Sequence, residues 1–432
     1  MRQLKSFMVF YLRVLPSYIF LRMTFRHPEN MQRRYLIRLL KYCQKHNEYF
    51  KKFLDFDLNS LETTDILSKL PLLTKEIIRK EQKNIYSDEI TDDYSKWANT
   101  GGSTGEPLRF PLLSYPNNSF ESTNQLYLYL QMGWHFGETV VSVDGSRVPD
   151  DSLANNVFWI EGVNFPYGRY CLSTLYMENE NISHYIKFLN KVKPKIIRGY
   201  PSGVAKICSY AKMNNIAFEF SPKGVYLTSE TITEEDKTLI SETLHTKVWG
   251  QYGHTETSVF AISRPGFNEY KCSPYYGITE VLDQNGKHVS VGEKGEIVVT
   301  GFSHKGLPFI RYKTGDMAIY GGNENGWIVL KSLLGRSVDY IVNSQGVKIY
   351  LTGFIFGGHL RAFNYINDWQ IKQTESGLVT IKIVRGNEWT SQYEEELVNL
   401  FNSKDIRISI EYVSSIPRSK RGKRIFMLQN LK

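Results

Sequence analysis

Short apolar segments alternate with helix-like segments between residues 118 and 253, and this alternation constrains the fold most strongly. Apolar runs that suit strands lie at 139–145, 194–200, 224–229 and 247–253, and the segments 118–136, 183–192, 202–213 and 233–243 suit helices. Strands that alternate with helices favour parallel βαβ units. We therefore expect an α/β protein with a parallel sheet in this part of the chain.

The pattern of apolar residues and turns changes on both sides of that region. Residues 31–56 have the apolar period of a helix, whereas short strand-like runs with glycine-containing turns occupy 277–283, 295–301 and 327–332. After residue 335 the sequence predicts a hairpin about Ser376-Gly377, a helix over 392–401 and a strand over 406–413. We expect a large N-terminal domain, 1–334, that includes a small β subdomain, and a small α+β domain, 335–432.

Charge and cysteine content narrow the class of protein. The formal net charge is +9, but the 53 basic residues are spread along the chain without an RNA-binding pattern, so we expect no nucleic-acid partner. The charge suits anionic small substrates or a lipid surface. The cysteines are scattered and form no CxxC pair, which argues against a zinc ribbon or a disulfide framework and favours the cytoplasm: Cys43, Cys171, Cys208 and Cys272.

An apolar segment near the N-terminus, residues 6–23, raises the question of membrane contact. Arg13 and Pro16 interrupt it before it reaches the roughly 20 residues that a spanning helix needs, and no cleavage site follows. We expect neither a signal peptide nor a transmembrane span. Two interpretations stay open: a helix packed on the domain, or an interfacial segment at the inner membrane face, where Arg2, Lys5 and Arg22 would favour anionic lipid.

The segment NTGGSTGEPLRF, residues 99–110, has the composition of an anion-binding loop. Glycines let backbone N–H groups converge, and hydroxyl side chains add donors. It is not a P-loop, because Glu106 and Pro107 follow the last glycine where Lys and Ser or Thr are required. Taken alone it fits a flexible connection equally well. Its candidate phosphate-binding residues are Thr100, Gly101, Gly102, Ser103, Thr104 and Gly105.

Five further segments follow this loop in a fixed order. They are YLTSE (226–230), GQYGHTE (250–256), RYKTGD (311–316), LGRSVDYI (334–341) and PRSKRGK (417–423). Together with the loop, this series resembles the adenylate-forming ligases, the superfamily of acyl-CoA synthetases and adenylation domains. The phenylacetate-CoA ligase branch is the most similar, and within it the short homologues of capsular polysaccharide clusters. The resemblance covers residues 95–425.

The resemblance implies roles for residues of each motif in binding ATP, Mg²⁺ or the transition state. The Gly/Ser/Thr loop would hold the β- and γ-phosphates of ATP, Tyr252 would stack on adenine, Thr255 would bond the α-phosphate and Glu256 would hold Mg²⁺. Asp316 would accept hydrogen bonds from the ribose hydroxyls, and Lys423 would be the catalytic lysine, whose charge suits the transition state of adenylation. The remaining residues that the resemblance assigns to the ATP site are Ser229, Glu230 and Arg336.

Three positions depart from the family pattern. The acidic hinge residue expected two positions after Arg336 is replaced by Val338, with Asp339 next to it. The lysine that many relatives place after the loop proline is absent. Cys272 alone cannot form the zinc site that some relatives carry. Rotation of the small domain between half-reactions is therefore expected by analogy only.

The segment between the loop and the second motif would supply the acyl pocket. It contributes the cations His135, Arg147, Arg169 and Arg198 beside aromatic residues that include Trp134, Phe158 and Tyr200. Cations there suit a polar or doubly charged acid, whereas surface ion pairs would explain each arginine equally well. We take His135, Arg147, Arg198 and Tyr200 as substrate-binding candidates.

These features predict an AMP-forming ligase that uses ATP and Mg²⁺ to activate a carboxylate. The acyl group would then pass to an amine or hydroxyl acceptor in surface polysaccharide biosynthesis. Transfer to CoA is one alternative. A non-catalytic nucleotide-binding protein at the membrane surface is the other, although the retention of Lys423, Glu256 and Asp316 favours an enzyme.

Overall fold

The computed structural model describes most of the chain in separate stretches. These are residues 28–90, 95–99, 108–113, 119–162, 168–336, 340–350, 365–386, 388–419 and 427–429, with isolated positions at Met8, Leu12, Leu15, Pro16, Tyr18, Ile19, Ala362, Gly422, Ile425 and Leu431. The expected α/β architecture is present: a many-stranded mixed sheet with helices, followed by a C-terminal α+β region.

The chain divides into two compact units. The first joins residues 1–135 to 250–333, and the second joins 136–249 to 334–432. One boundary lies at residues 333 and 334, where we expect the C-terminal domain to begin. That residues 335–432 move as a separate domain stays a prediction.

Helices at the start of the first unit pack on its β-sheet. They are α3 (Pro28–His46), α4 (Glu48–Lys51), α5 (Thr63–Ser68), α6 (Lys75–Lys80), α7 (Gln82–Ile85) and, later in the chain, α8 (Ser119–Gln131). Leu36, Leu40 and Phe50 are fully buried in the core that the early helices share with strand residues such as Val299.

The continuous helix expected over residues 31–56 is wrong, because the chain breaks at Asn47. Asn47 has an extended backbone with φ −143°, and its Oδ1 accepts from the backbone N–H of Phe50 at 2.9 Å, which caps α4. Its side-chain amide donates to the carbonyl of Ile85. A buried asparagine with these partners stabilises two helices instead of one.

The β-structure of the first unit is mainly antiparallel. β11 (Gly277–Leu282), β12 (Lys294–Gly301), β13 (Tyr312–Glu324), β14 (Trp327–Arg336), β10 (Tyr270–Cys272), β9 (Phe260–Ser263) and β8 (Val248–Gly253) are neighbours in that order. A separate ribbon pairs β1 (Ser95–Asn99) with β2 (Arg109–Leu113). The strands predicted at 277–283, 295–301 and 327–332 are therefore confirmed.

The second unit contains the predicted parallel strands. β3 (Val140–Asp144) is parallel to both β5 (Tyr170–Ser173) and β6 (Ile196–Gly199), and β6 is parallel to β7 (Gly224–Thr228). All five residues of β7 are buried, as is usual for a parallel strand covered on both faces. β4 (Trp159–Glu161) is an antiparallel edge strand.

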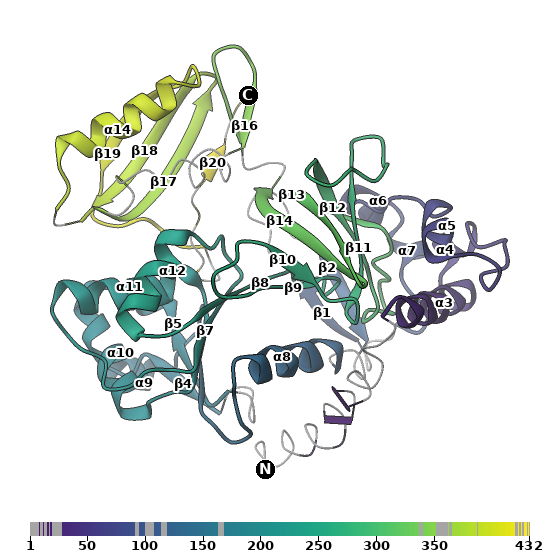
Figure 1. The fold of residues 1–432 in the computed structure, drawn as a ribbon, viewed down its shortest axis with the longest axis horizontal. Helices are drawn as coiled ribbons and strands as arrows, with labels where there is room; N and C mark the ends of the chain where they lie inside the picture. Colours follow the sequence, from purple (N-terminus) through teal and green to yellow (C-terminus); the bar gives the residue numbers. More distant parts are fainter. Residues whose placement is uncertain are drawn as a thin grey trace. The chain divides into compact units, whose positions relative to one another are not determined.

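Helices flank these parallel strands. α10 (Asn179–Val192), α11 (Pro201–Met213) and α12 (Glu234–Leu244) lie beside the strands of the second unit, with the short α9 (Asp150–Ala154) and the 3₁₀ turn Thr174–Tyr176 (Figure 1). The helices predicted at 183–192, 202–213 and 233–243 are confirmed, and α10 begins earlier than predicted, at Asn179. Ile186, Val204 and Ile240 share one core with Val141 and Val225.

The C-terminal part of the second unit has its own core. β19 (Arg407–Tyr412), β18 (Leu378–Arg385), β17 (Ile366–Glu375) and β20 (Met427–Gln429) form a four-stranded sheet, and β15 (Tyr340–Val342) pairs with β16 (Lys348–Tyr350). α14 (Ser391–Asn402) runs along this sheet (Figure 1) and buries Leu397 and Phe401 against Ile381 and Ile383. This is the α+β region that the sequence predicts.

Apolar side chains are exposed in the described part of the N-terminal segment. Met8, Leu12 and Ile19 are 52%, 68% and 50% exposed, whereas Tyr18 is buried. Among the described residues, no helix combines the length and the apolar character that crossing a membrane requires.

Candidate active site

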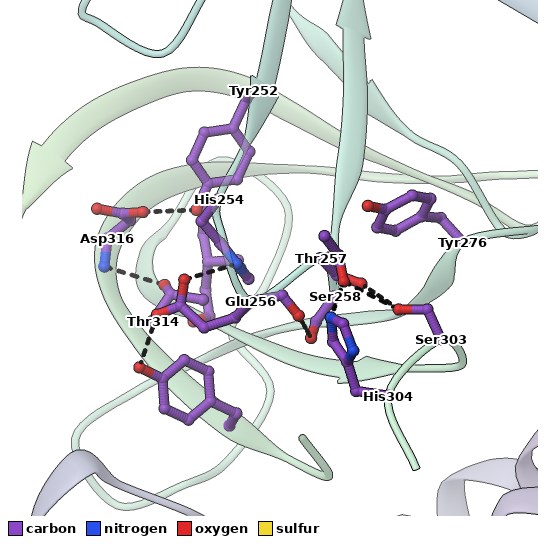
Figure 2. A network of polar contacts seen from close by, with 12 residues as sticks. Tyr252, His254, Glu256, Thr257, Ser258, Tyr276, Ser303, His304, Thr314 and Asp316 are labelled. Carbon is purple, nitrogen blue, oxygen red and sulfur yellow. Dashed lines mark hydrogen bonds and ion pairs between the residues drawn. The ribbon is translucent and has the colours of Figure 1, made fainter. Parts of the chain in front are cut away.

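Tyr252 and Asp316 face each other at one end of the site in the first unit. Tyr252 lies near the end of β8 and donates its phenol hydrogen to Oδ2 of Asp316 at 2.7 Å (Figure 2). Burial raises the pKa of Tyr252 well above its usual value, and the Asp316 charge and hydrogen bond raise it further. The phenol is therefore a permanent donor to the carboxylate.

The TGD segment of β13 holds Asp316 in place. Thr314 Oγ1 donates to the carbonyl of Ile297 at 2.8 Å. It also accepts from the backbone N–H of Asp316 at 3.0 Å (Figure 2). Gly315 has φ +78°, a conformation that favours glycine, and its N–H donates to Oε1 of Glu296 at 3.2 Å. The Thr-Gly-Asp order thus produces a local irregularity in the strand that presents the aspartate.

Glu256 is a buried carboxylate with a partner at each oxygen. It follows β8 in a turn closed by the Thr257 N–H on the His254 carbonyl at 3.0 Å. Oε1 accepts from the Tyr312 hydroxyl at 3.1 Å. Oε2 lies 3.4 Å from Nδ1 of His254 (Figure 2). Burial alone would raise the pKa of Glu256, but the charge and hydrogen bond of His254 outweigh it and bring the pKa to about 2. The side chain is therefore ionised at neutral pH.

Thr257, Ser303 and His304 form a second polar cluster beside Glu256. The Thr257 hydroxyl is hydrogen-bonded to Nε2 of His304 and lies 3.0 Å from Ser303 Oγ, which donates to the Thr257 carbonyl at 2.9 Å (Figure 2). Burial lowers the pKa of His304 to about 4. The imidazole is therefore neutral at physiological pH, and this cluster fixes the turn that carries Glu256.

The structure brings four of the predicted residues together. Tyr252, Thr255 and Glu256 come from β8 and the turn after it, and Asp316 comes from β13. Thr255 is exposed, whereas Glu256 is buried. Glu256 supplies oxygen ligands of the kind Mg²⁺ prefers, and no cluster of three or more metal-ligating side chains occurs within the described stretches.

A second predicted group lies at a cavity in the second unit. The cavity has a volume of about 380 Å³ and lies where β3, β6 and β7 end. Arg198, Tyr200 and Ser229 line it, as does Asp144, which the sequence analysis missed. Glu230 Oε2 accepts from the Ser202 N–H at 3.1 Å at the start of α11. Ligands commonly bind at the carboxyl ends of parallel strands.

Other substrate-binding candidates lie elsewhere on the surface. His135 and Arg147 are exposed and are not among the described residues that line the cavity. Arg169 is also exposed and pairs with Glu161 at 3.2 Å, which matches the alternative of a surface ion pair. Substrate contacts of His135 and Arg147 therefore stay predictions.

Several candidates fall outside the described residues. These are Lys423 and the whole anion-binding loop Thr100, Gly101, Gly102, Ser103, Thr104 and Gly105, while Arg336 ends β14 with a side chain that is not described. Their roles stay predictions. Gly422, which precedes Lys423, is described: it has φ +70°, and its carbonyl accepts from Thr174 Oγ1 at 3.2 Å.

Partners of the predicted residues were not identified from the sequence. Tyr312 and His254 both contact Glu256, and both stand inside motifs already singled out, RYKTGD and GQYGHTE. Asp144 directly follows the buried run of β3, and a polar residue at that end of a parallel strand is a usable signal. His304 stands outside every motif, so no local signal identifies it.

Comparison with known proteins agrees with the motifs. Protein CapK of Staphylococcus aureus is 26% identical over 412 residues, covering 90% of this chain and 87% of that protein. The crystal structure of 2-hydroxyisobutyryl-CoA ligase in the postadenylation state, in complex with R3-HIB-AMP, has a TM-score of 0.72 at 16% identity, covering 93% of this chain and 89% of that one.

An amide-forming enzyme is also among the similar structures. The GH3.15 acyl acid amido synthetase has a TM-score of 0.59 at 16% identity, covering 92% of this chain and 88% of that one. No family model matches the chain. The expected resemblance is confirmed: the chain has the fold of the adenylate-forming ligases and is similar to protein CapK over most of its length.

Proposed function

We propose that the protein activates a carboxylic acid with ATP and transfers the acyl group to an amine or hydroxyl acceptor in bacterial surface polysaccharide biosynthesis. The observation that carries the proposal is the site formed by Tyr252, Glu256 and Asp316, residues from two motifs that resemble those of adenylate-forming ligases. Similarity to CapK supports the polysaccharide role.

The proposed reaction has two half-reactions. A carboxylate oxygen of the acid attacks the α-phosphorus of ATP, the bond from that phosphorus to the bridging oxygen of the β-phosphate breaks, and pyrophosphate leaves. The acceptor nitrogen or oxygen then attacks the acyl carbon, its proton is released, and AMP leaves with the electron pair of the acyl–oxygen bond. Lys423 would stabilise the charge that develops at the α-phosphate in the first step.

Each residue of the first-unit site has a proposed task. Asp316 accepts from the ribose hydroxyls, since a carboxylate offers two acceptor oxygens and Tyr252 occupies Oδ2. Tyr252 contacts adenine, and Thr255, exposed in the turn, bonds the α-phosphate. The carboxylate of Glu256 suits Mg²⁺ as a ligand, because its pKa of about 2 keeps it ionised. Mg²⁺ is usually held by one or two carboxylates together with the phosphates of the nucleotide. Bound Mg²⁺ would offset phosphate charge.

The acceptor distinguishes the proposal from its alternative, an acyl-CoA ligase. Solved neighbours include both kinds of enzyme, a CoA ligase and an amido synthetase, so the fold permits either. A product assay on the purified protein decides between them, with ATP, a panel of acids, and CoA, amino sugars and amino acids offered in parallel. We expect amide or ester products. Rapid acyl-CoA formation with no amide or ester would contradict this acceptor.

Peripheral membrane contact is a second element of the proposal. The exposed Met8, Leu12 and Ile19 lie among basic residues of the N-terminal segment, a composition that suits the surface of an anionic membrane. We infer a cytoplasmic protein that rests on the inner membrane face, where glycan precursors are assembled.

A further inference from the structure

The cavity of the second unit has polar walls formed by three neighbouring strand ends. β3 contributes Ser142 and Asp144, β6 contributes Arg198, and Thr228 stands at the end of β7. Between them, Gly199 allows the backbone strands to approach closely, since a Cβ there would collide with the carbonyl of Val143. At about 380 Å³ the cavity is near the small end of the range for ligand pockets.

Two contacts connect this cavity to the proposed chemistry. Ser229, from the motif assigned to the ATP site, lines it and has φ +73°. In addition, Gly422 packs so tightly that a Cβ would lie 3.0 Å from Cα of Gly145, which also lines the cavity. Lys423 is the next residue in the chain. The cavity is therefore lined by a residue of the segment proposed to bind ATP and by a glycine that packs against the residue before the proposed catalytic lysine.

Arg198 provides donors at this cavity. Its backbone pairs with that of Tyr226 across β6 and β7, and its guanidinium lies 5.6 Å from the centre of the Tyr226 ring. Packing against an aromatic ring restricts the guanidinium plane, and a guanidinium carries five N–H donors in a fixed geometry.

Asp144 provides acceptors at the same cavity. Among the described residues, its hydrogen-bond donors converge on one oxygen, Oδ1: the Ser146 N–H at 2.9 Å, the Ser146 hydroxyl at 2.5 Å and the Cys171 thiol at 3.0 Å. Burial and the Asp144 charge raise the pKa of Cys171 to about 12, so the thiol stays protonated and donates. Oδ2 of Asp144 is then available to a ligand.

We propose that this cavity binds the carboxylic acid substrate and selects a small hydroxylated acid, with Arg198 donating to its oxygen atoms and Asp144 accepting from one of its hydroxyl groups. The inference rests on the proposed function. A hydroxyl group both donates and accepts, so a hydroxylated acid satisfies the cation, the anion and the hydroxyl-lined wall together. An aryl ring would cover these polar groups without bonding them, and a second carboxylate would face Asp144.

The first test is acid-dependent ATP–pyrophosphate exchange with four acids as probes, each of which carries at least one carboxylate. The probes are 2-hydroxyisobutyrate and glucuronate, which carry hydroxyl groups, phenylacetate, which is apolar, and malonate, which has a second charge. We expect a hydroxylated acid to give kcat/KM at least about ten-fold above the other two probes. Higher kcat/KM with phenylacetate or malonate, or exchange with neither hydroxylated acid by a protein that binds ATP, would overturn the inference. Failure to bind ATP would instead contradict the proposed function.

The second test separates Arg198 and Asp144 from a merely structural role. Arg198→Gln and Asp144→Asn should each raise KM for the preferred acid by about ten-fold or more and leave KM for ATP within about two-fold, because each loses a charge-assisted hydrogen bond to the acid alone. Arg198→Lys should recover part of the loss. Arg407→Gln, an exposed arginine of β19, is the matched control and should change neither KM. Unchanged acid KM in folded Arg198→Gln and Asp144→Asn would overturn the inference.

Discussion

The phenol of Tyr252 donates a 2.7 Å hydrogen bond to Oδ2 of Asp316, and this bond joins two motifs that are far apart in the sequence. Such a bond restricts the orientation of the carboxylate. We expect Tyr252→Phe to lower the affinity for ATP and AMP by about five-fold, ~1 kcal/mol, because Asp316 loses a fixed donor. Titration calorimetry with both nucleotides measures this. Unchanged affinity would show that the hydrogen bond does not position Asp316.

Asp316→Ala should weaken ATP and AMP binding to the same extent, since the two nucleotides share the ribose. Losing the charge-assisted hydrogen bonds to its hydroxyls should cost roughly 1.5–3 kcal/mol. The same calorimetric experiment, with Asp55→Ala as an exposed aspartate control, checks this. If AMP bound as tightly as it does to the wild type, the ribose site would lie elsewhere.

The strands of the second unit were predictable from the sequence because local composition determines them. β3, β6 and β7 are short apolar runs bounded by polar or glycine-containing turns, and each lies within the predicted range. The break at Asn47 has a local signal that was overlooked, since asparagine is a common N-cap residue, but the contact of its side chain with the carbonyl of Ile85, distant in the sequence, was not predictable. Local periodicity cannot report such a tertiary contact.

The candidate site likewise has residues that the sequence indicates and contacts that it does not. The motifs identify Tyr252, Glu256 and Asp316, but no spacing rule indicates that Tyr312 donates to Glu256 or that Tyr252 donates to Asp316. His304 is a single histidine whose partner, Thr257, comes from another segment, so only the folded chain reveals it.

Stability should fall between pH 6.5 and 4 because of His304. Burial lowers its pKa from 6.5 to about 4, so the unfolded chain binds a proton in this range that the folded chain does not. Between pH 7 and 5 the loss should be on the order of 2 kcal/mol from this group. The contribution of Glu256 to the free energy of unfolding is lost mainly below pH 4.5, because its pKa is lowered from 4.5 to about 2.

Urea denaturation at pH 7, 6 and 5 measures this dependence. In His304→Gln the free energy of unfolding should depend less on pH between 7 and 5 than in the wild type, whatever the stability of the variant at pH 7. His245→Asn is the control, because His245 is exposed and its left-handed backbone, φ +49°, tolerates asparagine. An equal slope in the wild type and in His304→Gln would contradict the buried neutral state of His304.

Vesicle binding should depend on the exposed apolar residues near the N-terminus. We expect the protein to co-sediment with vesicles that contain phosphatidylglycerol more than with pure phosphatidylcholine, and to be released by salt. Met8→Glu with Leu12→Glu should abolish this, whereas Met213→Glu, which changes a methionine that is 46% exposed at the end of α11, should not. Equal binding by all variants would contradict membrane contact through this segment.

Acid-dependent ATP–pyrophosphate exchange by wild type and Lys423→Ala tests the central claim most directly. We expect the wild type to exchange with its acid and Lys423→Ala to lose at least about a hundred-fold in rate while calorimetry shows ATP binding largely kept, because the lysine stabilises charge that develops in the transition state. Lys420→Ala, from the same basic segment, should remain active. Near-normal exchange by Lys423→Ala would remove this lysine from the mechanism, and a wild type that binds ATP but exchanges with no acid would contradict adenylate formation.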